Sequence, residues 1–153
     1  MGKTLVILMG LQGSGKSTFY MTHLAESYVR VNLDTLKNRN REKELFDQCI
    51  SEGADLAIDN TNPTRADRER YIIPAKEAGY RVVGYFIESK LRACIQRNAQ
   101  REGKACVPEI AIAATYNKLQ YPAYDEGFDE LHFVKNDGVT MSIEPWRESG
   151  ERK

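Results

Sequence analysis

Short, almost entirely apolar runs alternate along the chain with longer amphipathic segments. The apolar runs lack the polar alternation of a half-exposed strand, which is typical of strands covered by helices on both faces. They predict strands at residues 4–9, 28–32, 55–58, 81–87 and 130–134. The amphipathic segments predict helices at residues 16–27, 35–52, 63–78, 91–100 and 108–119. The third helix is expected to begin with Asn62 as its cap and Pro63 at its first position.

This order of strands and helices predicts an α/β fold built on a parallel sheet, in one domain over residues 1–153. A turn at residues 136–138 follows the last strand, and we expect the charged tail, about residues 145–153, to fray. Ligands of such folds bind outside the carboxyl ends of the strands. The chemistry is therefore expected in four loops, those after Met9, Asn32, Ile58 and Ile87.

Composition narrows the classes of protein that the chain can belong to. Of its 153 residues, 22 are Lys or Arg and 22 are Asp or Glu, so no net charge points to nucleic acid or membrane, although a local basic patch would be enough. The three cysteines form no CxxC pair, which argues against a disulfide framework and a zinc site. The apolar run at residues 5–9 is too short for a membrane span. We therefore expect a cytoplasmic protein with reduced thiols and no membrane partner.

A glycine-rich segment joins the first predicted strand to the first predicted helix. Residues 10–17 read GLQGSGKS and match the pattern GxxxxGK[ST] at every fixed position. Glycines let successive backbone N–H groups face a phosphate, and the helix N-terminus adds positive potential. The sequence therefore predicts a nucleoside triphosphate site, with Lys16 on the β- and γ-phosphates and the Ser17 hydroxyl on Mg²⁺. The residues expected to bind the nucleotide here are Gly10, Gln12, Gly13, Ser14, Gly15, Lys16, Ser17 and Thr18.

Two acidic residues follow predicted strands that end beside this loop. Asp34 comes after the second strand, and Asp59 ends the third. Phosphoryl transfer to an alcohol needs one acid to accept the proton of the attacking hydroxyl and another to hold the metal or its waters. The alternatives are structural: Asp34 as the cap of the helix that follows, and Asp59 as an acid that satisfies the turn at residues 60–62. The phosphate loop favours the functional interpretation of both.

Two arginines, Arg97 and Arg101, stand one helical turn apart and share a face. Neither has an acidic residue three or four positions away. A guanidinium binds phosphate oxygens in a bidentate manner. An arginine pair that has no acidic residue at helical spacing and precedes a glycine-containing loop therefore predicts a lid that closes on phosphates. Two solvated arginines on an exposed helix face are the alternative.

Four segments together resemble the 5′-kinase domain of polynucleotide kinase, the kinase half of polynucleotide kinase/phosphatase. They are GLQGSGKSTF at 10–19, VNLDTL at 31–36, AIDNTNP at 57–63 and RNAQREGKACVP at 97–108. The resemblance implies a three-layer P-loop kinase fold with helices on both faces of a five-stranded parallel sheet, in strand order 2-3-1-4-5. It also implies a small lid at about residues 97–108, and ATP and Mg²⁺ as cofactors.

The resemblance further implies a role for each matching position. Asp34 would be the general base that activates a 5′-hydroxyl. Asp59, with Ser17, would support the phosphate loop and the metal shell. Arg97 would lie near the nucleotide, and Arg101 would clamp the triphosphate and stabilise the charge of the transition state.

The chain departs from the family pattern beside the expected base. Leu33 stands where the family commonly has arginine, and Lys37 stands where some members have an arginine for the 3′-phosphate of the acceptor. Lysine keeps the charge but loses the fork of a guanidinium. Asp34 and Lys37 are nevertheless expected to contact the acceptor, and no phosphatase half is expected within these residues. These two departures affect the predicted identity of the acceptor more than the predicted phosphoryl transfer.

A polynucleotide acceptor would need a positive groove that leads to Asp34. The candidates are Arg30, Lys37, Arg39, Arg41, Lys43, Arg65, Arg68 and Arg70, and the alternative is a solvated helix face. Three functions therefore stay open. They are a kinase of the 5′-hydroxyl of an oligonucleotide or polynucleotide, a kinase of a small alcohol such as a nucleoside or sugar, and a nucleotide-dependent switch.

Overall fold

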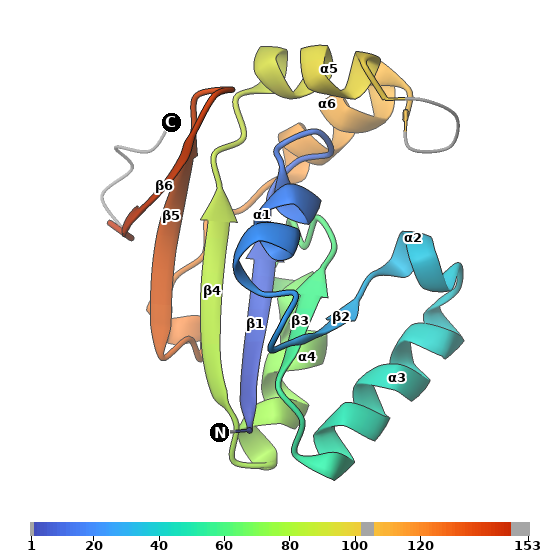
Figure 1. Ribbon diagram of the computed structural model, residues 1–153, viewed down its shortest axis with the longest axis vertical. Coiled ribbons are helices and arrows are strands. Elements are labelled where there is room, and N and C mark those ends of the chain that lie inside the picture. The colour runs from blue at the N-terminus through green and yellow to red at the C-terminus, as the bar shows by residue number, and fades with distance from the viewer. Residues whose placement is uncertain (1, 102–105, 148–153) are drawn as a thin grey trace.

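A six-stranded sheet forms the centre of the computed structural model, which describes residues 2–101 and 106–147 (Figure 1). The strands are β1 (Thr4–Met9), β2 (Val29–Val31), β3 (Leu56–Asp59), β4 (Arg81–Ile87), β5 (Glu130–Asn136) and β6 (Met141–Pro145). Their order is β2-β3-β1-β4-β5-β6, and only the pairing of β5 with β6 is antiparallel. The predicted α/β class, parallel sheet and order of the first five strands are confirmed.

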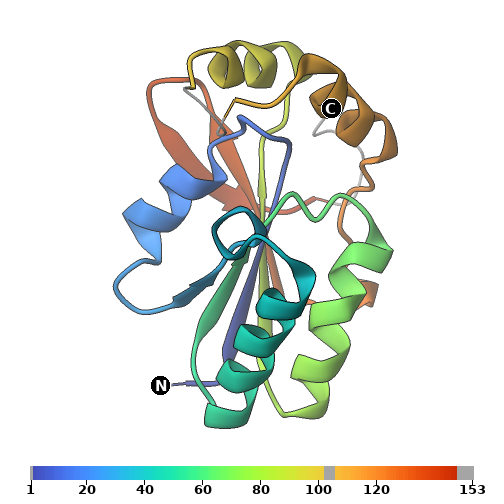
Figure 2. The same cartoon turned by 90° about the vertical axis from the view of Figure 1, so that its right-hand side faces the viewer.

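Helices cover both faces of the sheet and its carboxyl edge. They are α1 (Lys16–His23), α2 (Leu33–Leu36), α3 (Arg39–Glu52), α4 (Arg65–Glu77), α5 (Leu91–Ala99), α6 (Glu109–Lys118) and the 3₁₀ turn η2 (Tyr124–Glu126). Figure 2 shows α1 on one face of the sheet and α3 and α4 side by side on the other. In Figure 1, α5 and α6 lie beyond the carboxyl ends of the strands. Among the described residues, no helix is both long and apolar enough to cross a membrane.

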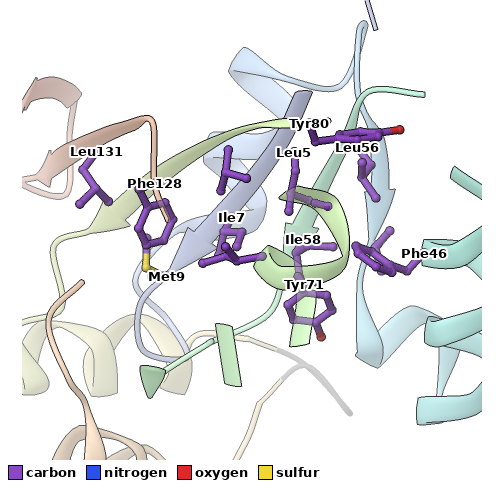
Figure 3. Close-up of a cluster of buried hydrophobic side chains, with 14 of the residues drawn as sticks. Leu5, Ile7, Met9, Phe46, Leu56, Ile58, Tyr71, Tyr80, Phe128 and Leu131 are labelled. Carbon is purple, nitrogen blue, oxygen red and sulfur yellow. The ribbon is translucent and has the colours of Figure 1, made fainter. Parts of the chain in front are cut away.

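Strand β1 shows why residues 5–9 are all apolar. Leu5 and Ile7 belong to the larger buried cluster, which includes Phe46 of α3 and Tyr71 of α4 (Figure 3). Val6 lies on the opposite face, in the cluster built with α1. Side chains alternate across a strand, so a strand covered on both faces buries every position.

The chain after β5 differs from the prediction. The fifth strand runs on to Asn136, and the Asp137 carboxylate accepts hydrogen bonds from the N–H groups of Val139 and Thr140, each at 2.8 Å, which closes the turn into β6. The tail expected to fray includes Trp146, which is only 7% exposed and packs against Phe86. Fraying is therefore wrong for residues 145–147, and residues 148–153 lie outside the described part.

Two helix boundaries also differ for local reasons. The helix predicted over residues 35–52 is two helices, because Lys37 has a φ of 71° and the Asn38 side chain caps α3. The predicted cap Asn62 has a φ of 46°, and the helix instead begins at a capping box between Thr64 and Asp67. A positive φ cannot continue an α-helix, so α3 and α4 begin later than the pattern indicated.

A buried ion pair ties α4 to η2. Arg68 is fully buried, and its Nε and Nη2 donate to the two carboxylate oxygens of Glu126 at 2.8 and 3.0 Å. Its Nη1 donates to the carbonyl oxygens of Asn62 and Gln120. Arg68 is therefore a structural residue, and its prediction as part of a basic groove is wrong.

The substitution Glu126→Gln should lower the free energy of unfolding by about 3–5 kcal/mol, because it leaves the Arg68 guanidinium buried without its counter-ion. Asp47→Asn is the matched control, since the Lys43–Asp47 pair is exposed and should contribute less than about 1 kcal/mol. Urea unfolding of both variants and the wild type measures the difference. Equal losses in the two variants would contradict the structural role of Arg68.

Candidate active site

The loop after β1 has two positions, 13 and 15, where the backbone conformation favours glycine. Gly13 has a φ of 82°, and a Cβ there would lie 2.3 Å from the backbone oxygen of Cys94 on α5. Gly15 has a φ of 106° and stands at the N-cap of α1 without a side-chain hydrogen bond to the helix. The first N–H groups of α1 therefore receive no cap from residue 15, and a helix N-terminus left this way attracts anions.

Lys16 projects into the space that this loop encloses. Its side chain is buried, with 9% exposure, and Nζ donates to the carbonyl oxygen of Leu11 at 3.0 Å. Burial lowers the pKa of Lys16 to about 8, although the carboxylates of Asp59 and Asp34 act to raise it. The Arg101 guanidinium adds to the lowering. The structure thus brings three of the predicted site residues within electrostatic range of Lys16.

Asp59 lies at the carboxyl end of β3 and is 1% exposed. Its Oδ2 accepts a hydrogen bond from the Ser17 hydroxyl at 3.2 Å and another from Arg30 Nε at 2.8 Å. The described residues contain no cluster of three or more His, Cys, Asp or Glu able to hold a metal ion. Two neighbouring oxygens, one hydroxyl and one carboxylate, nevertheless suit Mg²⁺, which commonly takes one or two protein ligands beside waters and phosphates. Ser17 and Asp59 therefore fit the predicted metal site.

Asp34 stands exposed on the short helix α2, beside a cavity of about 250 Å³. The cap of that helix is Asn32, whose Oδ1 accepts a hydrogen bond from the Thr35 N–H at 3.0 Å, so the alternative role of Asp34 as a cap is wrong. The Gln12 side chain lines the same cavity, and its buried Oε1 has no hydrogen-bond partner among the described residues. A carboxylate and an unsatisfied acceptor therefore lie at one cavity.

A buried polar network that the sequence analysis did not identify holds α2 in place. Asn60 Oδ1 accepts a hydrogen bond from the Leu33 N–H at 2.9 Å, directly before Asp34. Asn60 Nδ2 donates to Glu42 at 2.6 Å, and the Tyr71 hydroxyl donates to the same carboxylate oxygen at 2.9 Å. Glu42 is 2% exposed. Asn60 lies within the AIDNTNP run, whose specificity was the available signal, but its partners come from three separate helices, α2, α3 and α4.

The charged residues expected around the acceptor divide into two groups. Arg65 pairs with Asp125 at 2.9 Å, and Arg30 pairs with Asp59 at 2.8 Å, so neither is a free cation of a groove. Lys37 is exposed and is not among the described residues that line the cavity beside Asp34. The cations that do line it are Arg39, Arg70 and Lys118. Lys118 was missed because α6 lies far along the chain from Asp34.

A second cavity, of about 570 Å³, lies on the other side of the phosphate loop. Arg97, Thr18 and Gly15 line it together with the turn between β5 and β6. Arg97 Nη1 donates to the Gly13 carbonyl oxygen at 3.0 Å, and Asn136 Nδ2 donates to the Ser14 carbonyl oxygen at 2.7 Å. The turn at residues 136–138 was predicted, but nothing in its sequence linked it to the loop.

The arginine pair lies at the end of α5. This helix ends at Ala99, and the Arg101 N–H donates to the Asn98 carbonyl oxygen at 3.0 Å just beyond it. Arg97 contacts the phosphate loop, and Arg101 acts on the pKa of Lys16. Both arginines therefore lie close to the phosphate loop. Part of the predicted lid, residues 102–105, lies outside the described residues.

Comparison with known proteins assigns the chain to a family. The sequence pattern of the AAA domain family matches residues 5–44 and 39–122, a stretch that contains the phosphate loop, Asp34, Asp59 and both arginines. The chain belongs to the AAA domain family. All residues of this AAA domain that the sequence predicted to bind nucleotide, metal or acceptor lie inside the matched segments.

Two curated relatives carry the name that the sequence resemblance predicted. A bifunctional polynucleotide phosphatase/kinase of Schizosaccharomyces pombe is 29% identical over 134 residues, 85% of this chain and 33% of that protein. A bifunctional polynucleotide phosphatase/kinase of Acanthamoeba polyphaga mimivirus is 31% identical over 139 residues, 86% of this chain and 33% of that protein. The resemblance is confirmed, and the AAA domain spans about a third of the length of these relatives.

A solved structure supports the fold. The AAA domain aligns with a sugar kinase from Janibacter sp. HTCC2649 with a TM-score of 0.65 and 16% sequence identity, over 87% of this chain and 85% of that one. At this level of identity the likeness shows the shared α/β arrangement. The sheet here has one strand more than the sequence predicted, the antiparallel β6.

Proposed function

We propose that this AAA domain is an ATP- and Mg²⁺-dependent kinase that transfers the γ-phosphate to the 5′-hydroxyl of a polynucleotide or oligonucleotide. The observation that carries the proposal is the position of Asp34, which borders a cavity and acts electrostatically on the phosphate-loop lysine, Lys16. A nucleotide-binding protein without transfer needs no carboxylate there. The names of the two curated relatives support the class of acceptor.

In the proposed reaction, Lys16 and the N–H groups at the start of α1 bind the phosphates of ATP, and Arg101 neutralises charge that develops on the transferred group. Asp34 accepts the proton of the acceptor hydroxyl while the oxygen of that hydroxyl forms a bond to the γ-phosphorus. The bond between that phosphorus and the β–γ bridging oxygen breaks, and ADP leaves with the electron pair. Ser17 and Asp59 would hold Mg²⁺, which supplies further charge neutralisation on the phosphates.

The charges beside Asp34 support an anionic acceptor. Arg39, Arg70 and Lys118 line the same cavity. Arg39 pairs with Glu42 at 2.8 Å, whereas Arg70 and Lys118 have no ion pair among the described residues. A phosphodiester that follows the 5′-hydroxyl would meet these cations. A small alcohol is the second candidate, since the whole chain has no net charge that would attract a polyanion.

An acceptor panel with ATP labelled at the γ-phosphate tests the proposal. The acceptors are DNA and RNA oligonucleotides with a 5′-hydroxyl, nucleoside 3′-monophosphates, nucleosides and sugars. The matched control is the same oligonucleotide with a 5′-phosphate, which should accept no label. We expect the fastest transfer to a 5′-hydroxyl oligonucleotide. Transfer to nucleosides or sugars alone would establish the second candidate, and ATP hydrolysis that no acceptor alters would overturn both in favour of a switch.

A further inference from the structure

Arg30 places a guanidinium between the two oxygens assigned to the metal. It projects from β2, and its Nε and Nη2 both lie 2.8 Å from Asp59 Oδ2. Its Nη2 also donates to the Ser17 hydroxyl oxygen at 2.8 Å. The guanidinium carbon lies 5.6 Å from the ring centroid of Tyr20, which supports the side chain from one side. One cation thus contacts both Ser17 and Asp59.

A divalent cation held by Ser17 and Asp59 would meet the guanidinium at the Ser17 hydroxyl oxygen and at Asp59 Oδ2. Mg²⁺ binds its ligands at about 2.0–2.1 Å and demands near-ideal octahedral geometry. The Asp59 oxygen that would serve it already accepts hydrogen bonds from Ser17 and Arg30. Two cations on one carboxylate oxygen also repel each other, and the repulsion is strong because Asp59 is 1% exposed and poorly screened.

We infer that Arg30 is an exchangeable counter-cation of the metal site, so that a divalent cation binds only by displacing the guanidinium from Asp59 and Ser17. The identity of the cation as Mg²⁺ rests on the proposed function, whereas the competition rests on the contacts alone. Without nucleotide, Arg30 satisfies the buried carboxylate and keeps metal affinity low. Phosphate oxygens bring further negative charge, so the metal binds together with the nucleotide instead of ahead of it.

The side-chain exposure of Arg30 fits exchange better than a fixed structural pair. Its side chain is 30% exposed, so the guanidinium has a solvated route away from Asp59. Arg68 offers the contrast, since it is fully buried and donates to four oxygens of Glu126, Asn62 and Gln120. Both arginines neutralise a buried carboxylate, but only Arg30 does so beside the phosphate loop.

Binding of Mn²⁺ to the nucleotide-free protein, measured from the electron paramagnetic resonance signal of the free ion, tests the inference. Arg30→Gln should bind Mn²⁺ about tenfold or more tightly than the wild type, since hydrogen bonds to a charged group are worth about 1.5–3 kcal/mol. Adding Asp59→Asn to Arg30→Gln should remove the gain, which assigns it to this site. Arg92→Gln, on the exposed face of α5, is the control with the same loss of charge and should match the wild type.

A conservative variant guards against a change in folding. Arg30→Lys keeps the charge but makes fewer of the three contacts, so its Mn²⁺ affinity should fall between those of the wild type and Arg30→Gln. Unchanged or weaker Mn²⁺ binding in both Arg30 variants would overturn the inference. The Mn²⁺ measurement involves no phosphoryl transfer. A wild-type protein that fails the acceptor panel would therefore overturn the proposed function without changing the outcome of the Mn²⁺ measurement.

Discussion

Replacing Asp34 with asparagine should lower the rate of phosphoryl transfer to a 5′-hydroxyl oligonucleotide by about 10²–10⁴-fold, the usual contribution of a general base. Asparagine has nearly the same shape but its amide oxygen does not take the proton of the attacking hydroxyl. The helix should stay in place, because its cap is Asn32 and its first turn is held by Asn60. Neither contact involves the Asp34 side chain.

Nucleotide binding separates this loss from a general defect. Asp34 borders the cavity lined by Arg39, Arg70 and Lys118, whereas Arg97 lines the separate cavity beside Gly15 and Thr18. Asp34→Asn should therefore bind ATP about as well as the wild type in a calorimetric titration. The control Asp47→Asn removes an exposed carboxylate from α3 and should keep the wild-type transfer rate. A fully active Asp34→Asn enzyme would end the assignment of the base.

The phosphate loop and the central strands could be predicted because their signals are local. The loop has fixed positions set by backbone geometry and charge, and strands such as β4 read as apolar because both faces are covered. Arg81–Ile87 was placed to the residue for this reason. The acidic residues followed from the same logic, since the ends of neighbouring parallel strands meet at one edge of the sheet.

The features that were missed depend on distant partners. Strand β6 has mostly exposed positions, and only Met141 within it packs against a buried cluster, so its sequence carries no strand signal. The buried Trp146 follows it in the segment predicted to fray. The role of Glu42 follows from Asn60 and Tyr71, which lie on other elements. Arg68 was predicted as a cation of the acceptor groove, but its Nε lies 2.8 Å from Glu126 Oε1, a partner 58 positions along the chain. Periodicity carries no information about such contacts.

Replacing Lys16 with methionine should lower transfer by about 10²–10³-fold, the cost of removing one preorganised donor from the developing charge. Methionine preserves the length and the apolar stem of the side chain but not the ammonium group. Because burial and Arg101 already hold the pKa of Lys16 down at about 8, its charge in the free protein depends on pH in the range where kinases are assayed.

The same residue should couple nucleotide binding to proton uptake. Above pH 8 the free protein holds Lys16 mostly neutral, but the phosphates of a bound nucleotide favour the ammonium and raise its pKa, so binding takes up a proton. Affinity for ADP should therefore fall as pH rises above about 8, by up to about tenfold per pH unit. The last phosphate proton, with a pKa of about 6, is already lost in this range and does not contribute.

Calorimetry in two buffers of different ionisation enthalpy measures that proton directly. At about pH 9, above the Lys16 pKa of about 8, the apparent binding enthalpy of the wild type should differ between the buffers. Lys16→Met has no proton to take up, and Lys16→Arg stays charged throughout, so both variants should show one enthalpy and a flat affinity across the range. A flat profile in the wild type would mean that Lys16 is not the cation that the phosphates meet. A sloping profile in Lys16→Met would assign the proton to another group.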